Sequence, residues 1–228
     1  MIDMFLLATI VILSYLVGSI PTSIIVTKIS KGIDIRDYGS GNAGGTNVMR
    51  VLGWKQGVFV ILLDALKGVI AVVFIARLHY GSMPFNNPTP FDDFTFIQII
   101  AGVSAVIGHI WTVFAGFRGG KGIATALGML LMISTVDMLV AIGVFIIVVG
   151  ISRYVSLGSI IGAIAVPLTL VIRENLFNVD IPGYNTLLPF VVFVTLLVIY
   201  THRKNIVRLA NGNEHKISFS KKKKSNLV

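Results

Sequence analysis

The sequence predicts an all-α membrane protein, a single polytopic bundle of transmembrane helices. Of its 228 residues, 55% are hydrophobic and only 13% are charged, and the mean hydropathy is +0.88. Several apolar runs also approach the roughly 20 residues that are needed to cross about 30 Å of hydrocarbon. Lipid offers the backbone no hydrogen-bonding partners, so such runs form helices. We therefore expect one integral-membrane domain, residues 1–216, followed by a basic cytoplasmic tail, residues 217–228.

The apolar runs set the order of the predicted spans. They predict spans at residues 4–27, 58–76, 96–114, 157–172 and 187–201. Pro21 is expected to kink the first of these, with Ser19, Thr22 and Ser23 available to bind the freed carbonyls. The first run lacks a basic start and a good cleavage site, so it is expected to be a retained helix. Residues 33–55 and 77–94 are interpreted as loops, the second without chemistry.

Residues 123–151 could form one long tilted helix or two short helices hinged at residues 134–137. Basic residues favour the cytoplasmic side of a membrane, so their placement helps to choose. With two short spans, 16 of the 19 Lys and Arg residues fall on one side. This favours seven spans, with the N-terminus outside and the C-terminus inside.

The predicted span at 58–76 carries two opposite charges, Asp64 and Lys67, one helical turn apart. Such a pair can neutralise itself within the bundle. Intramembrane ion pairs often mark functional sites. A structural pair near the interface is an equally good interpretation, and both remain open.

A glycine-rich turn, GHIWTVFAGFRGGKGIAT at residues 108–125, follows the third predicted span. Glycine permits a tight turn, and Gly119 and Gly120 can offer amide groups that converge on an anion. Arg118 and Lys121 supply positive charge, so the turn predicts phosphate binding. A helix cap or a lipid-headgroup anchor is the alternative. His109, at the end of the span, fits a hydrogen-bonded structural residue better than a base.

Three further polar clusters lie between the predicted spans. The first, GSGNAGGTNVMR at residues 39–50, combines small donors with Arg50, whose planar guanidinium suits phosphate. In the second, SRYVSLGS at 152–159, Ser152, Ser156 and Ser159 would share one face if helical. The third, THRKNIVRL at 201–209, places His202 and Asn205 one turn apart. The alternative for the first cluster is an ordinary loop. The alternative for the second is a set of hydroxyls that bind neighbouring helices, and for the third it is a basic juxtamembrane helix.

The predicted topology gathers these clusters at one membrane surface. The cations expected there are Arg50, Arg118, Lys121, Arg153 and Arg203. The only acids expected near them are Asp34 and Asp37. The residues needed for catalysis by a carboxylate pair, or for a metal site of His, Asp and Glu, are therefore missing. The chain has no cysteine, which excludes thioester chemistry and disulfides. We expect a site for anions at a lipid boundary, with no cofactor and no metal.

The net charge of +9 is concentrated partly in the tail, where residues 221–224 are four consecutive lysines. Such a tail typically contacts anionic membrane lipid. Nucleic acid is not expected as a partner.

In their order and spacing, GSGNAGGTNVMR, GHIWTVFAGFRGGKGIAT, SRYVSLGS and HRKNIVRLANGNE resemble the acyl-phosphate:glycerol-3-phosphate acyltransferase family of bacterial membranes. The resemblance covers nearly the whole chain except residues 77–94 and the lysine tail. Gly45 and Thr112 depart from it, since the family usually has Ala and Pro there.

The resemblance implies transfer of a fatty acyl group from acyl phosphate to the 1-hydroxyl of glycerol 3-phosphate, giving lysophosphatidic acid and phosphate. It implies a multi-pass protein of the bacterial cytoplasmic membrane with its active site on the cytoplasmic face, and the acyl-phosphate-producing enzyme as a possible partner. The implied catalytic positions are Ser40, Arg50, Lys121, Ser156 or Ser159, His202 and Asn205. The expected phosphate-binding positions are Asn47, Arg50, Gly119, Gly120, Lys121 and Arg153.

The sequence leaves two other classes of protein as alternatives. A transporter of an organic phosphate predicts polar groups at mid-membrane and internal repeats, but only Asp64 and Lys67 lie that deep and no repeat is visible. An acyl-CoA-dependent acyltransferase resembles enzymes with an H-x-x-x-x-D motif. None of the four histidines, at positions 79, 109, 202 and 215, has Asp five residues later.

Overall fold

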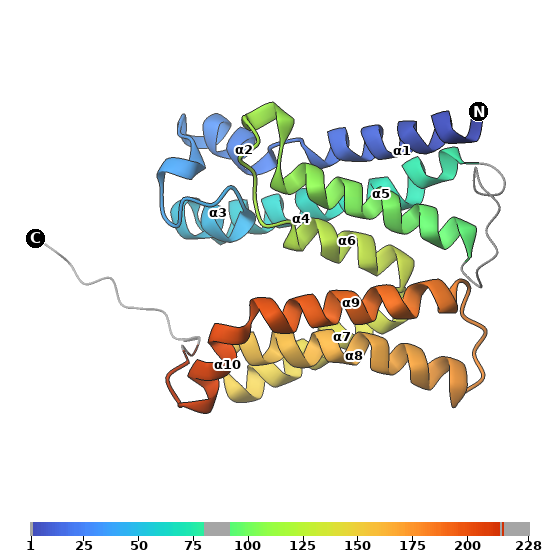
Figure 1. The fold of residues 1–228 in the computed structure, drawn as a ribbon. Helices are drawn as coiled ribbons and strands as arrows, with labels where there is room; N and C mark the ends of the chain where they lie inside the picture. The colour runs from blue at the N-terminus through green and yellow to red at the C-terminus, as the bar shows by residue number, and fades with distance from the viewer. Residues whose placement is uncertain (1, 80–91, 215, 217–228) are drawn as a thin grey trace, which may run out of the picture. The chain divides into compact units, whose positions relative to one another are not determined.

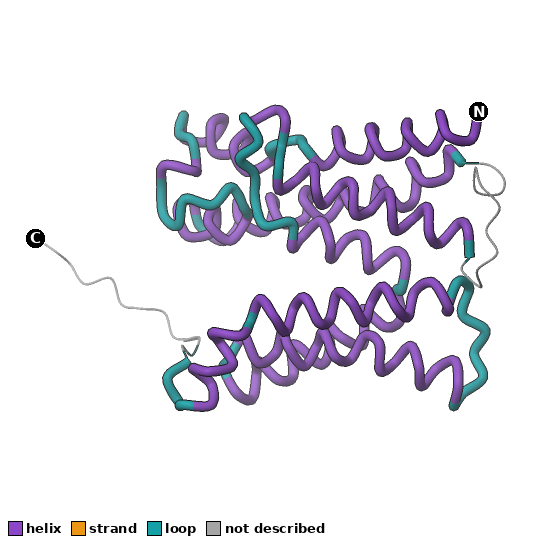
Figure 2. The backbone as a smooth tube through the Cα atoms, viewed as in Figure 1, coloured by secondary structure: helices purple, strands orange, loops and turns teal. Residues whose placement is uncertain are grey.

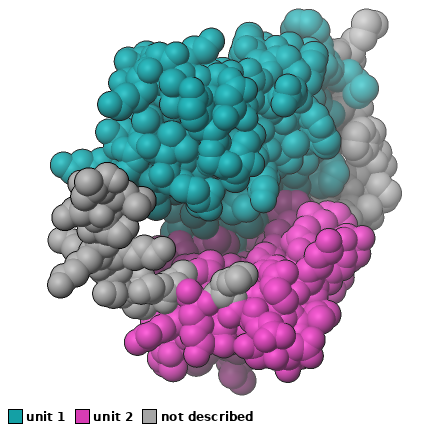
Figure 3. Space-filling view, turned by 90° about the vertical axis from the view of Figure 1, so that its left-hand side faces the viewer, with its two compact units in different colours: residues 1–135 teal, residues 136–228 magenta. Residues whose placement is uncertain are grey.

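The computed structural model describes residues 2–79, 92–214 and 216, which are helices joined by loops, without a strand in those ranges (Figure 2). The chain divides into two compact units, residues 1–135 (unit 1) and 136–228 (unit 2) (Figure 3). Most of the connector predicted at 77–94, together with His215 and the tail at 217–228, lies outside the described residues.

The longer helices of unit 1 run side by side (Figure 1). Its helices are α1 (Ile2–Gly18), α2 (Thr22–Lys31), α3 (Gly45–Leu52), α4 (Trp54–Ile70), α5 (Asp93–Ile110) and α6 (Ile123–Ile133). A π-helical turn, Ala71–Ile75, and a 3-10 turn, Ala76–Leu78, continue α4. Two short 3-10 turns, Ile35–Asp37 and Val113–Ala115, lie in its loops.

Glycines allow the helices of unit 1 to pack closely. A Cβ atom on Gly18 of α1 would collide with the carbonyl of Ala105 on α5. A Cβ on Gly68 of α4 would likewise collide with the carbonyl of Thr125 on α6. Small residues at such crossings let helix backbones approach, which is how membrane helices commonly associate. As a result α1 is fixed on α5, and α6 is fixed on α4.

Two groups of buried apolar side chains form the core of unit 1. The first joins α1, the end of α4 and α5, and consists of Ile10, Ala71, Ile75, Ala76, Ile97, Ala101 and Ala105. The second lies under the loops at the other end and consists of Ile24, Ile35, Ala43, Val48 and Val60. The polar loops of unit 1 therefore rest on a packed apolar base.

Unit 2 contains α7 (Thr135–Ser152), α8 (Val155–Asn175), α9 (Tyr184–Thr201) and the short α10 (Arg203–Ala210). Helix α8 packs on α9, and α10 packs on both. An ion pair of 2.8 Å joins Asp137, in the first turn of α7, to Arg173, in the last turn of α8.

The all-α membrane fold is confirmed. By length and composition, six helical segments of the described chain could cross a membrane: Met4–Lys31, Trp54–Leu78, Asp93–Ala115, Thr135–Ser152, Val155–Asn175 and Tyr184–Thr201. Helix α6 is apolar but shorter. The count of seven spans and the orientation stay predictions.

Local details both match and depart from the sequence predictions. Residues 123–151 form two helices separated at Ser134, as the hinged alternative predicted. The first predicted span is interrupted between Gly18 and Thr22, next to Pro21. The loop predicted at 33–55 was wrong in part, because it contains α3. The glycine-rich composition suggested a loop, but packing of α3 against α4 stabilises the helix.

Candidate active site

Asn47 holds the first glycine-rich loop together. Its side chain is 1% exposed. Its Oδ1 accepts a hydrogen bond of 2.8 Å from the backbone N–H of Ser40. Its Nδ2 donates to three loop carbonyls, those of Ile35, Tyr38 and Asn42, at 3.2, 2.9 and 3.1 Å. One buried amide thus fixes the loop that presents Ser40, while direct phosphate binding by Asn47 stays a prediction.

We expect Asn47→Ala to lower the free energy of unfolding by about 3 kcal/mol, because it leaves buried backbone groups without partners. Chemical unfolding in detergent measures this loss. Thr46→Ala is the matched control, since Thr46 is exposed on the same helix. Equal stability of the two variants would contradict the role given to Asn47.

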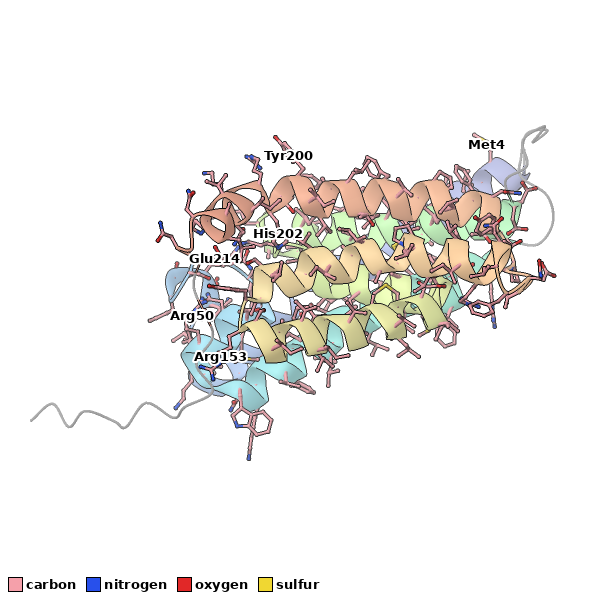
Figure 4. All side chains as sticks on the ribbon, turned by 90° about the horizontal axis from the view of Figure 1, so that it is seen from below. Met4, Arg50, Arg153, Tyr200, His202 and Glu214 are labelled. Atoms are coloured by element: carbon pink, nitrogen blue, oxygen red, sulfur yellow. The ribbon has the colours of Figure 1, made fainter. Side chains whose placement is uncertain are left out.

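Arg50 lies in the last turn of α3 and is exposed. The buried face of α3 carries Gly45, Asn47 and Val48, so the arginine points away from the helix's packed side. Arg50 and Met4 lie at opposite ends of unit 1 (Figure 4). The guanidinium is therefore presented at the end of the unit that carries the polar loops.

Arg36 connects this first loop region to the turn that follows α5. It binds the Asp34 carboxylate, with its Nη2 2.7 Å from Oδ2, and this hydrogen bond lowers the pKa of Asp34. Its Nη1 donates to the carbonyl of Ala115 at 2.8 Å. Sequence reasoning missed Arg36, although the Asp-x-Arg spacing was a usable signal.

The Gly-Gly-Lys-Gly turn is bound to the end of α5. The N–H of Gly119 donates to the carbonyl of Ile110 at 3.0 Å, and that of Gly120 to the carbonyl of His109 at 3.1 Å. These bonds correct the expectation that the two amides converge on an anion, because α5 already accepts them. Lys121 is exposed, so the cation of the turn is available.

Both glycines are required by close contact. A Cβ on Gly119 would collide with the carbonyl of His109, and one on Gly120 with the His109 ring. The latter would also lie 2.8 Å from the carbonyl oxygen of Ala43, in the first glycine-rich loop. The first glycine-rich loop and the turn of Lys121 are therefore neighbours in unit 1.

A cluster of buried polar side chains lies beneath the turn, and we call it the Asp64 cluster: Thr22, Asp64, Lys67 and His109. Lys67 Nζ is 2.7 Å from Asp64 Oδ1, which confirms the pair that the helical spacing predicted. Thr22 Oγ1 donates to the same oxygen, and His109 Nδ1 lies 3.5 Å from it. A small pocket beside Lys67, His109 and Gly120 has room for about one water molecule, too little for a substrate.

In unit 2, a second cluster surrounds the carboxylate of Glu214, and we call it the Glu214 cluster. Oε1 accepts hydrogen bonds of 2.9 Å from both Ser156 Oγ and Asn205 Nδ2. Oε2 accepts one of 2.7 Å from Arg208 Nε. These bonds lower the pKa of Glu214 to about 2, and the bond from Asn205 has the largest effect. Glu214 is therefore an ionised anchor for Ser156 and Asn205.

The Glu214 cluster corrects the prediction that Asp34 and Asp37 are the only acids near the polar clusters. Glu214 ends the segment HRKNIVRLANGNE, nine residues after Asn205, but nothing in that segment shows that the chain turns back to bring the acid to Asn205 and Ser156. Its side chain is 7% exposed, and glutamate is rarely so buried unless it is paired.

His202 lies between α9 and α10, where it ends one helix and begins the next. Its Nδ1 is 2.8 Å from the carbonyl oxygen of Val198. Arg153, His202 and Glu214 lie at the same end of unit 2 (Figure 4). Candidate residues from two distant segments therefore gather at that end.

The serines at 152–159 do not lie on one helix, so the shared face that a single helix would give them does not include Ser152. Helix α7 ends at Ser152, and α8 begins only at Val155, with Arg153 between them at a positive φ of 63°. Ser159 Oγ donates to the carbonyl of Val155 at 3.0 Å, one turn earlier. Only Ser156 joins the Glu214 cluster.

Each unit thus holds part of the predicted site. Unit 1 carries Ser40, Gly119, Gly120 and Lys121 on adjoining loops, and Asn47 and Arg50 on α3. Unit 2 carries Arg153, Ser156, Ser159, His202 and Asn205. No group of three or more His, Asp or Glu side chains within the described ranges could hold a metal ion.

Comparison with known proteins places these features in a family. The model of the family described as glycerol-3-phosphate acyltransferase matches residues 8–212. A relative from Chlorobaculum tepidum, named glycerol-3-phosphate acyltransferase, is 49% identical over 93% of this chain and 97% of its own. One from Chlorobium chlorochromatii, with the same name, is 49% identical over 96% of this chain and 100% of its own.

Solved structures agree with the sequence comparisons. The crystal structure of PlsY (YgiH), described as an integral membrane glycerol 3-phosphate acyltransferase in its glycerol 3-phosphate form, superposes with a TM-score of 0.67 at 37% identity, covering 96% of each chain. Its lysophosphatidic acid form matches with the same TM-score at 36% identity. The chain therefore belongs to the glycerol-3-phosphate acyltransferase family.

Proposed function

We propose that the chain transfers a fatty acyl group from acyl phosphate to the 1-hydroxyl of glycerol 3-phosphate. The products are lysophosphatidic acid and inorganic phosphate. Membership of the glycerol-3-phosphate acyltransferase family carries this proposal. Two solved relatives, described in glycerol 3-phosphate and lysophosphatidic acid forms, support the acceptor and the product.

Acyl phosphate is the donor that best suits the groups present. Arg50, Lys121 and Arg153 are exposed cations, and none of them forms an ion pair with a carboxylate within the described residues. Two phosphate-bearing substrates would satisfy them. Acyl phosphate is already activated, so the enzyme needs mainly to hold two anions and align one hydroxyl.

In the proposed reaction, the 1-hydroxyl oxygen of glycerol 3-phosphate attacks the carbonyl carbon of the acyl phosphate. The new ester C–O bond forms, the bond from that carbon to the phosphate oxygen breaks, and phosphate leaves with the electron pair. The hydroxyl proton passes to His202 or to a substrate phosphate. Cations near the phosphates stabilise the charge that moves onto the leaving group.

The contact of His202 supports its role as the proton acceptor. A carbonyl oxygen only accepts hydrogen bonds, so the contact with Val198 places the hydrogen of a neutral imidazole on Nδ1. Nε2 then carries the free lone pair and can take a proton.

Ser156 and Ser159 can be separated by experiment. We expect Ser156→Ala to lower kcat/KM about 10- to 100-fold, because it removes a hydroxyl of the Glu214 cluster. Ser159→Ala should have little effect, since Ser159 binds only a carbonyl of its own helix. Steady-state kinetics of the two variants measure the difference. A trapped acyl-serine at either position would overturn direct transfer.

The donor is tested by giving the purified protein glycerol 3-phosphate with palmitoyl phosphate or palmitoyl-CoA. We expect lysophosphatidic acid from palmitoyl phosphate alone. Product from palmitoyl-CoA alone would reject the proposed donor while leaving the acyltransferase activity intact. Liposome uptake of glycerol 3-phosphate without any product would favour a transporter.

We further propose a location in the bacterial cytoplasmic membrane with the cationic loops on the cytoplasmic face, where acyl phosphate could pass from the enzyme that makes it. The sequence contains no cysteine, so a single introduced cysteine is the only residue that a thiol reagent can label. Arg118→Cys and Arg153→Cys should both react with a membrane-impermeant thiol reagent from the cytoplasmic side only. Labelling from opposite sides would reject a common face.

A further inference from the structure

We infer that Asp64 and Lys67 act as positioning residues, which hold the Gly119–Lys121 turn in place through His109. The inference rests on the proposed role of Lys121 in binding a substrate phosphate. It gives the Asp64 cluster a part in the reaction, although none of its four side chains needs to touch a substrate.

Stability alone is a weak reason for such a cluster. Asp64 and Lys67 are 1% and 4% exposed, on a helix long and apolar enough to cross the membrane. Charges in such a helix are expensive, and a buried ion pair is often no more stabilising than well-packed apolar side chains. The pair calls for an explanation beyond packing.

His109 provides the connection from the pair to the turn. On one side its Nδ1 lies 3.5 Å from Asp64 Oδ1. On the other side its ring lies where a Cβ on Gly120 would be, and its carbonyl accepts the N–H of Gly120 at 3.1 Å. The ring of His109 therefore lies between Asp64 and Gly120, the residue before Lys121.

Lys67 fixes the surroundings of the histidine. Its Nζ donates a hydrogen bond of 2.6 Å to the carbonyl of Ile20, in the break between α1 and α2. The hydroxyls of Ser19, Thr22 and Ser23 were expected to bind the carbonyls freed by this break. Ser19 is in turn held by α5, because its Oγ donates to the carbonyl of Gly108 at 3.2 Å. Lys67 thus joins α4 to the segment that packs beside His109.

Helix α4, which carries Asp64 and Lys67, also holds the far end of the turn. Helix α6 begins at Ile123, two residues after Lys121, and packs on Gly68, which follows Lys67. The turn is therefore held before Lys121 by His109 and after it by α4. A small shift of α4 at Asp64 and Lys67 would act on both ends.

The test compares Asp64→Asn, Lys67→Met and the double variant with the wild-type protein. Melting temperature in detergent is measured for each, together with kcat and KM for both substrates. We expect each single variant to raise the KM for glycerol 3-phosphate or for acyl phosphate at least about tenfold. The double variant removes both charges, so it should recover melting temperature but retain the raised KM. Recovery of wild-type KM by the double variant would overturn the inference.

The chain offers a matched control in unit 2. Asp137 and Arg173 form another ion pair between helices, 2.8 Å long, with Asp137 1% exposed. The double variant Asp137→Asn/Arg173→Met should change melting temperature while leaving both KM values unchanged. A change of KM as large as that in the Asp64 and Lys67 variants would show that any lost ion pair has this effect, and would also overturn the inference.

His109→Asn gives a second test if the charge variants fold poorly. Asparagine can place an amide near the Nδ1 position, facing Asp64, but lacks the ring edge that lies against Gly120. We expect a raised KM with nearly wild-type melting temperature, whereas unchanged kcat and KM would reject the role of His109. A wild-type protein that uses another acyl donor would reject the proposed donor only, and the variants would then be assayed with that donor.

Discussion

Replacing Lys121 or Arg50 with alanine is expected to lower kcat/KM about 100- to 1000-fold, the loss typical when one group that stabilises transition-state charge is removed. Both side chains are exposed. Arg50 lies at the end of unit 1 opposite Met4 (Figure 4), and the turn of Lys121 adjoins the first glycine-rich loop. Neither holds another described residue by a side-chain hydrogen bond, so the variants should remain folded. Lysophosphatidic acid formation and melting temperature are measured together.

Lys55→Ala is the matched control for these variants. Lys55 is another exposed cation of unit 1, at the start of α4, with its Nζ 6.0 Å from the centre of the Trp54 ring. Removing it changes the net charge equally but should leave turnover near the wild-type value. A variant of Arg50 or Lys121 with retained activity would exclude that residue from the site. Arg50→Lys would separate charge from the planar, bidentate geometry of arginine.

Glu214→Ala is expected to have the second largest effect, lowering kcat about 100-fold. Its carboxylate holds Ser156, Asn205 and Arg208 in one arrangement. Loss of the carboxylate frees both proposed catalytic side chains at once. Kinetics of Glu214→Ala should therefore resemble those of a Ser156→Ala/Asn205→Ala double variant. If Glu214→Ala turned over like wild type, the cluster would have no part in the reaction.

Glu214→Gln isolates the link to Arg208. A glutamine oxygen could still accept from Ser156 and Asn205, but its NH2 group would face the Arg208 Nε–H, which is also a donor. We expect a smaller loss of activity than in Glu214→Ala. Arg208→Gln should show a similar loss, because it breaks the same contact from the other side.

The pH dependence of stability follows from the low pKa of Glu214. Its pKa is about 2 in the folded protein, below its ordinary value of 4.5, so the ionised form is favoured by folding. The stabilisation is fully present above about pH 4.5 and is lost as the pH falls toward 2. The difference in melting temperature between wild type and Glu214→Gln should be constant from pH 7 to 5 and shrink below pH 4.5. A difference that shrinks between pH 7 and 5 would contradict this assignment.

Periodicity along the chain was enough to predict the long apolar helices and the Asp64–Lys67 pair. Apolar runs reveal helices directly, since lipid removes every alternative for the backbone. The i, i+3 spacing of Asp64 and Lys67 fixes their proximity by helix geometry alone, and the structure places them 2.7 Å apart. Such local rules need no knowledge of the tertiary fold.

Contacts between distant segments were not predictable in this way. Glu214 meets Ser156 across 58 residues, and no pattern within either segment indicates the other. The glycines at 119–120 predicted a tight turn, but the sequence could not show that their amides donate to carbonyls of α5 and not to an anion. Helix α3 was missed because its stability comes from α4, against which it packs, and not from its own glycine-rich start.

The position of Glu214 also limits how the protein can be made and handled. Ser156 is synthesised long before its partner, so the Glu214 cluster can assemble only after α9 and α10 have left the ribosome. A chain cut between residues 202 and 213 would keep α1 through α9, yet lack the group that holds Ser156 and Asn205. Purification tags and C-terminal fusions should accordingly begin beyond Lys216.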